Sequence, residues 1–357
     1  MGGARARVPV GLLCLLLVAG CGTDDAAPTG DGAPVTAAGF LATYVDDDGR
    51  VVRRDQGGDT VSEGQAYAML IALTADDQET FDRVWGWTRD HLTRDDGLFS
   101  WHWADGAVVD EPSASDAEVD MARALLLAGD AWGGDYRDQA VALGGAVLDH
   151  LTVEVPAGRL LVAGQWATEA PYTFNPSYVS PVATAMLAEA SGDPRWAELE
   201  AGSRAALASL PGDQLPPDWA EVGTDGVARA TGSPDGSAPP AYSYDAARLP
   251  LRLAESCVED DTRLAASVAA LVARHDGDPV ARYDLQGAPQ SDDASPLVTM
   301  AQAAGLAAGG DTEAARSAVA AARDQQRASP TYYGDAWTVL APALLTDPDL
   351  GGCPPLG

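Results

Sequence analysis

The stretch PVATAMLAEASGDPRWAELEAGSRAALAS, residues 181–209, decides the fold class. Two runs of helix-forming residues, 177–190 and 194–209, flank the segment SGDPR at residues 191–195, whose glycine and proline interrupt a helix. A link this short places the two helices side by side and antiparallel, as an αα-hairpin. The first run is apolar nearly all round, which predicts burial on more than one face.

The same alternation of helical runs and breakers continues along the chain, and the strand-like alternation of polar and apolar residues is nearly absent. Links between pairs of runs are long and carry Trp, Tyr, Asn, Pro and carboxylates, and such loops are where sites are built. We predict an all-α domain, a toroid of helical hairpins with one helix of each pair inside; the rival, a stacked solenoid, lacks a fixed-period repeat. The predicted helices span residues 35–45, 62–75, 79–92, 116–130, 135–151, 177–190, 194–209, 243–258, 260–275, 294–308, 311–324 and 331–346.

The N-terminus has the order of an export signal. Arg5 and Arg7 precede an apolar run at residues 8–19, and the signal comprises residues 1–20. The following LVAGC resembles a bacterial lipoprotein box, which implies that Cys21 is acylated and anchors the chain to the outer face of the cell membrane. A plain secretory signal is the alternative. Residues 21–35 are predicted to be a flexible tether, and residues 36–350 the folded domain.

The net charge limits the kinds of binding partner, and the cysteine content limits the possible disulfide bonds. The net charge of −31 repels phosphate backbones and anionic lipid, so we expect no nucleic-acid partner and membrane contact only through the lipid. Once Cys14 leaves with the signal and Cys21 is acylated, Cys257 and Cys353 are the only pair left for a disulfide in an oxidising compartment. Two buried free thiols are the alternative. We expect a monomer.

Metal and triad chemistries find little support. The histidines are far apart in sequence and none has ligand spacing, and nucleophile elbows, P-loops and dinucleotide fingerprints are missing from suitable contexts. We therefore expect no cofactor and no metal. Carboxylates beside aromatic residues remain, and this combination suits a carbohydrate, because a carboxylate pair can act as acid and base on a glycosidic bond. The histidines are His91, His102, His150 and His275.

Three acidic segments permit a structural and a chemical interpretation. In TVSEGQAYAML, Thr60 and Glu63 have the spacing of a capping box. In SASDAEVDMAR, Asp116 also follows a capping serine, and Asp120 can pair with Arg123 along the helix. In YDAAR, an ion pair between residues 245 and 248 on a helix surface is enough to explain the two charged residues. Each segment taken singly fits a structural role.

Together and in this order, the segments resemble glycoside hydrolase family 8. The resemblance covers residues 39–345 and includes SEGQAYAML, SASDAEVDMARALLLA, FNPSYVSP, PPDW, YDAARLPLRLA and YYGDAWTVLAPALL. It implies an (α/α)6 barrel, with Glu63 as the general acid, Asp245 as the general base and Asp116 at the cleavage subsite. Ala66, Ala68 and Glu118 depart from the family pattern, which affects the expected substrate preference more than the chemistry.

The resemblance implies an inverting hydrolase of β-1,4-linked polysaccharide, first an endo-β-1,4-glucanase, with xylanase or chitosanase activity as alternatives. A tethered lipoprotein that binds glycan without hydrolysing it is the alternative from a different class. Inversion requires roughly 6.5–9.5 Å between the acid and the base. The candidate substrate-binding residues, with Asn175 and Tyr178 placed at the rim, are Tyr67, Trp101, Trp103, Trp166, Asn175, Tyr178, Arg248, Tyr332 and Tyr333.

Overall fold

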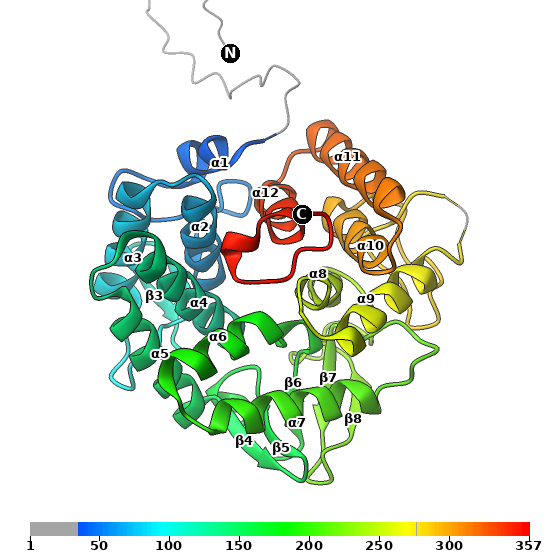
Figure 1. The fold of residues 1–357 in the computed structure, drawn as a ribbon, viewed down its shortest axis with the longest axis horizontal. Helices are drawn as coiled ribbons and strands as arrows, with labels where there is room; N and C mark the ends of the chain where they lie inside the picture. The colour runs from blue at the N-terminus through cyan, green and yellow to red at the C-terminus, as the bar shows by residue number, and fades with distance from the viewer. Residues whose placement is uncertain (1–34, 276) are drawn as a thin grey trace, which may run out of the picture. The chain divides into compact units, whose positions relative to one another are not determined.

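The computed structural model describes residues 35–275 and 277–357, so the predicted signal, nearly all of the tether and Cys21 lie outside the described residues. Within them, twelve α-helices follow one another, and each overlaps one predicted helix (Figure 1). The prediction of an all-α domain is confirmed. The helices are α1 Ala37–Tyr44, α2 Ser62–Thr74, α3 Gln78–Leu92, α4 Ser115–Trp132, α5 Tyr136–His150, α6 Pro181–Ser191, α7 Arg195–Ser209, α8 Leu249–Ala254, α9 Glu259–Val272, α10 Pro296–Ala308, α11 Thr312–Ala328 and α12 Tyr332–Thr346.

The helices form two concentric rings, as Figure 1 shows for the inner α8 and α12 and the outer α7 and α11. Each even-numbered helix contacts the next, and α12 contacts α2, which closes the inner ring. The burial of the helices agrees with their assignment to an inner and an outer ring. Every residue of the inner helix α2 from Gln65 to Ala72 is buried, whereas the outer helix α11 buries only Ala315, Ala322 and Gln326. Helix α6 was expected to be buried on several faces, but it buries only Val182, Ala183 and Leu187.

Helix α8 is much shorter than the predicted helix of residues 243–258. It begins at Leu249, and a 3₁₀ helix, η3 (Ala246–Arg248), precedes it. Pro250 explains the difference, because proline donates no backbone hydrogen bond and its ring clashes with the carbonyl four residues earlier. Residues 243–248 therefore form a compact turn ahead of α8, and this turn carries Asp245 and Arg248.

Short strands that the sequence did not predict lie in the long links between hairpins. They have two to four residues each, too few for alternation of polar and apolar residues to be visible. They pair antiparallel in the orders β1-β2-β3, β4-β5 and β6-β7-β8, and the pairing of Phe174 with Ala220 fixes two distant links together. The strands are β1 Thr60–Val61, β2 His102–Ala104, β3 Ala107–Asp110, β4 Thr152–Val155, β5 Gly158–Leu161, β6 Tyr172–Phe174, β7 Trp219–Val222 and β8 Ala228–Thr231.

The C-terminal segment after α12 is fastened to the inner helices by charge and by a covalent bond. Arg123 of α4 is fully buried and donates to both oxygens of Glu255, at 2.8 and 2.7 Å, and to the carbonyl of Leu350 at 2.7 Å. A disulfide joins Cys257 to Cys353. The expected pair of Asp120 with Arg123 is not formed, because Asp120 binds Arg252 of α8 instead.

None of the helices in the described part of the chain combines the length and the apolar character that crossing a membrane requires.

Candidate active site

One guanidinium gathers three carboxylates from three separate parts of the chain. Arg248 Nη1 donates to Asp116 Oδ2 at 2.6 Å and to Glu63 Oε1 at 2.9 Å, and Nη2 donates to Asp245 Oδ1 at 2.6 Å. Nη1 also lies 3.1 Å from the hydroxyl of Tyr67. Glu63 and Asp116 lie in the first turns of α2 and α4, and Asp245 directly precedes η3. The structure thus brings together all three acidic residues that the sequence singled out.

Glu63 takes no part in capping helix α2. Helix α2 begins after Val61, and no side chain accepts a hydrogen bond at this N-cap. Thr60, the expected partner in a capping box, donates to the carbonyl of Val51 at 2.7 Å and accepts from Arg50 Nε at 2.9 Å. The capping interpretation is therefore wrong for this stretch. The helix dipole still favours a carboxylate in the first turn.

The four charged groups differ in their access to solvent. The side chains of Glu63 and Asp245 are 26% and 31% exposed, whereas those of Asp116 and Arg248 are 7% and 3% exposed. Glu63 and Asp245 are therefore the more accessible of the four groups to a bound molecule. Arg248 has a fifth neighbour, because its guanidinium lies 5.3 Å from the ring centre of Tyr178.

Burial and like charge act on the protonation of Glu63. Burial raises its pKa well above 4.5, and the negative charge of Asp116 adds to this, against the opposing effect of Arg248. Three ionised carboxylates around one guanidinium would leave a net negative charge in a poorly solvated place, so a proton on Glu63 lowers the free energy. Because Oε1 accepts a hydrogen bond from Arg248, the proton belongs on Oε2.

Burial and neighbouring charges also act on the protonation of Asp245. Burial raises the pKa of Asp245 to about 6, Arg248 opposes this effect, and the charges of Asp218 and Asp116 add to it. With a pKa of about 6, Asp245 is mostly ionised at pH 7, whereas the upward shift at Glu63 favours its protonated form. Two carboxyl groups whose environments set their pKa values apart are the requirement for paired acid and base chemistry.

The aromatic candidates divide into exposed and buried sets. The side chain of Trp166 is 50% exposed, and Trp101 and Tyr333 are partly exposed. Tyr333 donates from its hydroxyl to the carbonyl of Tyr244 at 3.2 Å, and the two rings lie 6.4 Å apart. These residues are available for stacking on a sugar ring.

Four predicted site residues are placed differently from the expectation. Tyr332 is 2% exposed and packs against Phe40 and Tyr44, so it belongs to the core. Trp103 packs edge-on against Trp87 and His91 of α3.

Asn175 and Tyr178 are buried and do not lie at a rim. The amide of Asn175 faces Asp245 and lowers its pKa, while its oxygen accepts from the backbone and hydroxyl of Ser177 at 3.0 and 2.7 Å. Tyr67 is also buried and reaches the site only through Arg248.

Sequence reasoning missed two residues next to Asp245. Tyr244 is 54% exposed, and its place directly before Asp245 in SYDAAR was the available signal. Asp218, in the quoted segment PPDW, is buried and binds the turn that carries Asp245. Nothing local marked it, because its partners lie about 25 residues further along the chain.

A cavity of about 770 Å³ opens beside Tyr244 and Tyr333, at the N-terminal ends of α10 and α12. It is large enough for one or more sugar units. Its polar lining consists of carboxylates, amides and hydroxyls and a single arginine: Arg53, Asp55, Gln56, Asp292, Asp293, Ser295, Gln325, Ser329 and Thr331.

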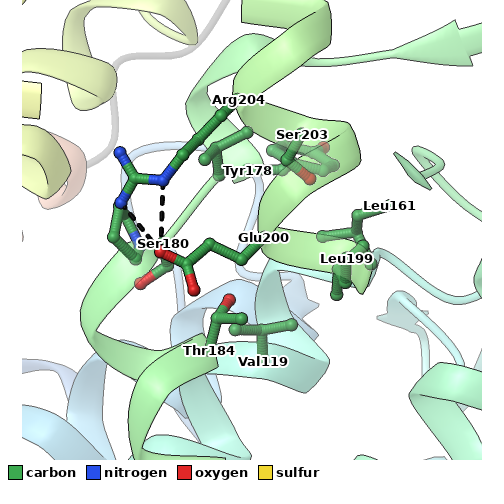
Figure 2. A pocket seen from close by; sticks show the side chains of 11 residues that line it. Val119, Leu161, Tyr178, Ser180, Thr184, Leu199, Glu200, Ser203 and Arg204 are labelled. Atoms are coloured by element: carbon green, nitrogen blue, oxygen red, sulfur yellow. Dashed lines mark hydrogen bonds and ion pairs between the residues drawn. The ribbon is translucent and has the colours of Figure 1, made fainter. Parts of the chain in front are cut away.

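A second cavity, lined in part by Tyr178, is only about 20 Å³ in volume (Figure 2). It lies between α6 and α7, where Glu200 and Arg204 form an ion pair at 3.1 Å. A space of this size holds one water molecule, so it is not a site for an organic ligand.

Metal binding has no structural support among residues 35–275 and 277–357, where no group of three or more His, Cys, Asp or Glu side chains is arranged to hold an ion. The carboxylates around Arg248 instead share one positive charge, that of the guanidinium. The geometry is that of two partly exposed carboxyl groups, Glu63 and Asp245, held by one guanidinium, an arrangement suited to paired acid and base chemistry.

Comparison with known proteins gives concordant matches. The family profile of Glycosyl hydrolases family 8 matches residues 31–346. A probable endoglucanase of Novacetimonas hansenii is 35% identical over 253 residues, 66% of this chain and 72% of that protein. An endoglucanase of Pseudomonas fluorescens is 37% identical over 153 residues, 39% of this chain and 38% of that protein. The crystal structure of an endo-β-1,4-glucanase from Acetobacter xylinum, 28% identical, superposes with a TM-score of 0.70 over 87% of this chain and 98% of that one.

Proposed function

The chain belongs to glycosyl hydrolases family 8, and from this membership and its site we propose that it is an inverting endo-β-1,4-glucanase. The family makes it a glycoside hydrolase with a polysaccharide substrate. The proposal adds the catalytic residues, the stereochemistry and the preferred glycan. It rests on one observation, the arrangement of Glu63, Asp116 and Asp245 around Arg248.

Glu63 is the general acid in this proposal. Its Oε2 gives a proton to the glycosidic oxygen as the bond to the anomeric carbon breaks, so the leaving chain departs as a neutral alcohol. Arg248 holds Oε1 at 2.9 Å and thereby fixes the carboxyl group in one orientation. The raised pKa of Glu63, due first to its burial, favours the protonated form that a general acid needs.

Asp245 is the general base. A water molecule attacks the anomeric carbon from the opposite face, Asp245 takes its proton, and the product is a hemiacetal of inverted configuration. Since Glu63 and Asp245 bind the two terminal nitrogens of one planar guanidinium, at 2.9 and 2.6 Å, their nearer oxygens lie within about 8 Å. This limit is compatible with the separation of roughly 6.5–9.5 Å in inverting enzymes.

Asp116 is assigned to a sugar at the cleavage point. Its Oδ1 is buried and has no hydrogen-bond partner among the described residues, while Oδ2 accepts from Arg248. A sugar hydroxyl is the donor that this oxygen suits. The exposed rings of Tyr244, Tyr333 and Trp166 then supply surfaces on which neighbouring sugar units can stack.

The test is hydrolysis by the purified protein. We expect reducing ends to appear from carboxymethyl-cellulose faster than from xylan, mixed-linkage glucan or chitosan, with a rapid fall in viscosity that marks internal cleavage. Proton NMR of cello-oligosaccharide hydrolysis should show the α-anomer first. Binding of the glycans without any release of reducing ends would instead support the non-hydrolytic alternative.

We also propose that residues 1–20 are a lipoprotein signal and that Cys21, after a short tether to residue 35, carries the lipid that anchors the catalytic domain of residues 36–350. The support is the order of charged, apolar and small residues ahead of Cys21. This places the enzyme on the outer face of the cell membrane.

A further inference from the structure

The turn that carries Asp245 is held by hydrogen bonds to one buried carboxylate from another part of the chain, that of Asp218. Asp218 Oδ1 accepts from the backbone N–H of Ser243 at 2.8 Å and from that of Ala246 at 2.9 Å, and Oδ2 accepts from the hydroxyl of Ser243 at 2.5 Å. These donors stand on both sides of Tyr244 and Asp245. No regular helix holds the turn, because α8 begins only at Leu249.

Asp218 is itself firmly fixed. Its backbone N–H donates to the carbonyl of Ala241 at 2.7 Å, and it directly precedes β7, which pairs with β6 and β8. Residue 218 is 9% exposed, and burial raises its pKa, while the three hydrogen bonds to its two oxygens oppose this effect and favour the ionised carboxylate. A charge therefore lies in a position that is rigid relative to Asp245.

We propose that Asp218 is a positioning residue for Asp245: it holds the turn that presents this carboxylate, and it sets a second negative charge next to it. The proposal rests on the proposed role of Asp245 as general base. Asp218 is buried, and all the hydrogen bonds of its carboxylate go to the turn itself, so it acts through Asp245.

The charge has a defined electrostatic effect. Asp218 is the largest contributor among the negative charges that raise the pKa of Asp245, after burial and the opposing Arg248. A base whose pKa is raised toward neutrality accepts a proton from water more readily, provided that it remains ionised at the working pH.

The other groups that face Asp245 are Glu63 of α2, Asp116 of α4, Asn175, Tyr178 of η2, Tyr333 of α12 and Arg248. Asp218 itself faces Tyr242 and Arg282.

Two substitutions of Asp218 distinguish the effect of its charge from the effect of its hydrogen bonds to the turn. Asp218→Asn keeps an oxygen that accepts from both backbone N–H groups but removes the charge. The low-pH limb of kcat/KM should move to lower pH by about 0.5–1 unit, because a neighbouring like charge has been removed. Asp218→Ala removes the charge and all three hydrogen bonds. It should shift the limb equally and also lower kcat about 10- to 100-fold, because the base is displaced.

Asp335→Asn is the matched control. Asp335 is another buried carboxylate with two side-chain donors, Tyr44 Oη at 2.7 Å and Gln326 Nε2 at 2.7 Å, but it is not among the charges that act on Asp245. This variant should leave the low-pH limb unmoved, even if its melting temperature falls.

A titration that does not depend on hydrolysis completes the test. The carboxyl ¹³C signal of Asp245 in aspartate-labelled protein, assigned with Asp245→Asn, should titrate at lower pH in Asp218→Asn than in the wild type. If the wild type hydrolyses no glycan, the proposed function fails, and the NMR titration still decides the role of Asp218. Identical titrations of Asp245 in the wild type and Asp218→Asn would overturn the proposal, whatever the change in stability.

Discussion

Glu63 and Asp245 bind the same guanidinium, since Arg248 donates to Glu63 Oε1 at 2.9 Å through Nη1 and to Asp245 Oδ1 at 2.6 Å through Nη2. They lie 182 residues apart in sequence, yet one rigid planar group fixes the orientation of both. The proposed acid and base are therefore coupled through a side chain that does not itself change protonation. Each of the first two predictions follows from this arrangement.

Glu63→Gln should lower the rate of hydrolysis of carboxymethyl-cellulose about 100- to 10,000-fold, because the general acid is lost. The melting temperature should not fall, since Glu63 caps no backbone N–H of α2 and an uncharged glutamine still accepts from Arg248. Activity assays and thermal unfolding of the same preparation measure both effects. A variant with near wild-type activity that melts several degrees lower would show that Glu63 has a structural role only.

Asp245→Asn provides the contrast. Aryl glycosides with good leaving groups need little help from an acid, so they should partly rescue Glu63→Gln but not Asp245→Asn, which lacks the base. Equal rescue of the two variants would contradict the assigned roles.

The pH dependence of kcat/KM should be bell-shaped. Activity should rise as pH increases through about 6, where Asp245 loses its proton, and fall at higher pH as Glu63, whose pKa is well above 4.5, becomes ionised. The free energy of unfolding should also depend on pH. Because the pKa of Glu63 is higher in the folded state than in the unfolded state, the folded state binds more protons above pH 4.5 and loses stability as pH rises.

The measurement is a series of rates and melting temperatures from pH 4 to 9. The advantage in melting temperature of Glu63→Gln over the wild type should grow with pH. A difference that stays constant across this range would mean that Glu63 titrates normally.

Arg123→Met should reduce the free energy of unfolding by about 3–5 kcal/mol, because Glu255 would remain buried without a partner. Replacing both residues by methionine should restore most of this loss, since two buried charges are then removed together. Urea denaturation measures the effect. The control is Arg263→Met, whose partner Glu259 is exposed, and it should cost no more than about 1 kcal/mol.

Cys353→Ser should lower the free energy of unfolding by about 2–5 kcal/mol, because the disulfide closes a loop between residues 96 positions apart. Reductant should destabilise the wild type by a similar amount and leave the variant unchanged. Alkylation of the folded, non-reduced protein should add no mass at either cysteine. Labelling of Cys257 or Cys353 under these conditions would show that the bridge is absent in solution.

Cys21→Ala should release the enzyme into the medium or leave it unprocessed, because the lipid attachment point is lost. Cell fractionation and mass spectrometry of the mature N-terminus measure this. Wild-type protein recovered only as a soluble, unlipidated species would refute the anchor.

The sequence by itself determined the helical architecture, because helix period and breaker residues act locally. The segment SGDPR placed α6 and α7 in a hairpin, and the other ten links were found in the same way. Six short motifs in order were enough to indicate the family and the three acidic residues. The strands were missed because segments of two to four residues depend on pairing partners far away in sequence.

Only the tertiary structure decided what each side chain contacts. Capping spacing at Thr60 and Glu63 was present, but Arg248 binds Glu63 and Thr60 binds elsewhere. Tyr332 and Tyr333 are neighbours in sequence, yet a helix turns about 100° per residue, so one ring enters the core and the other faces Tyr244. Local periodicity fixes which residues share a helix, whereas long-range packing and charge neutralisation fix which of them form the site.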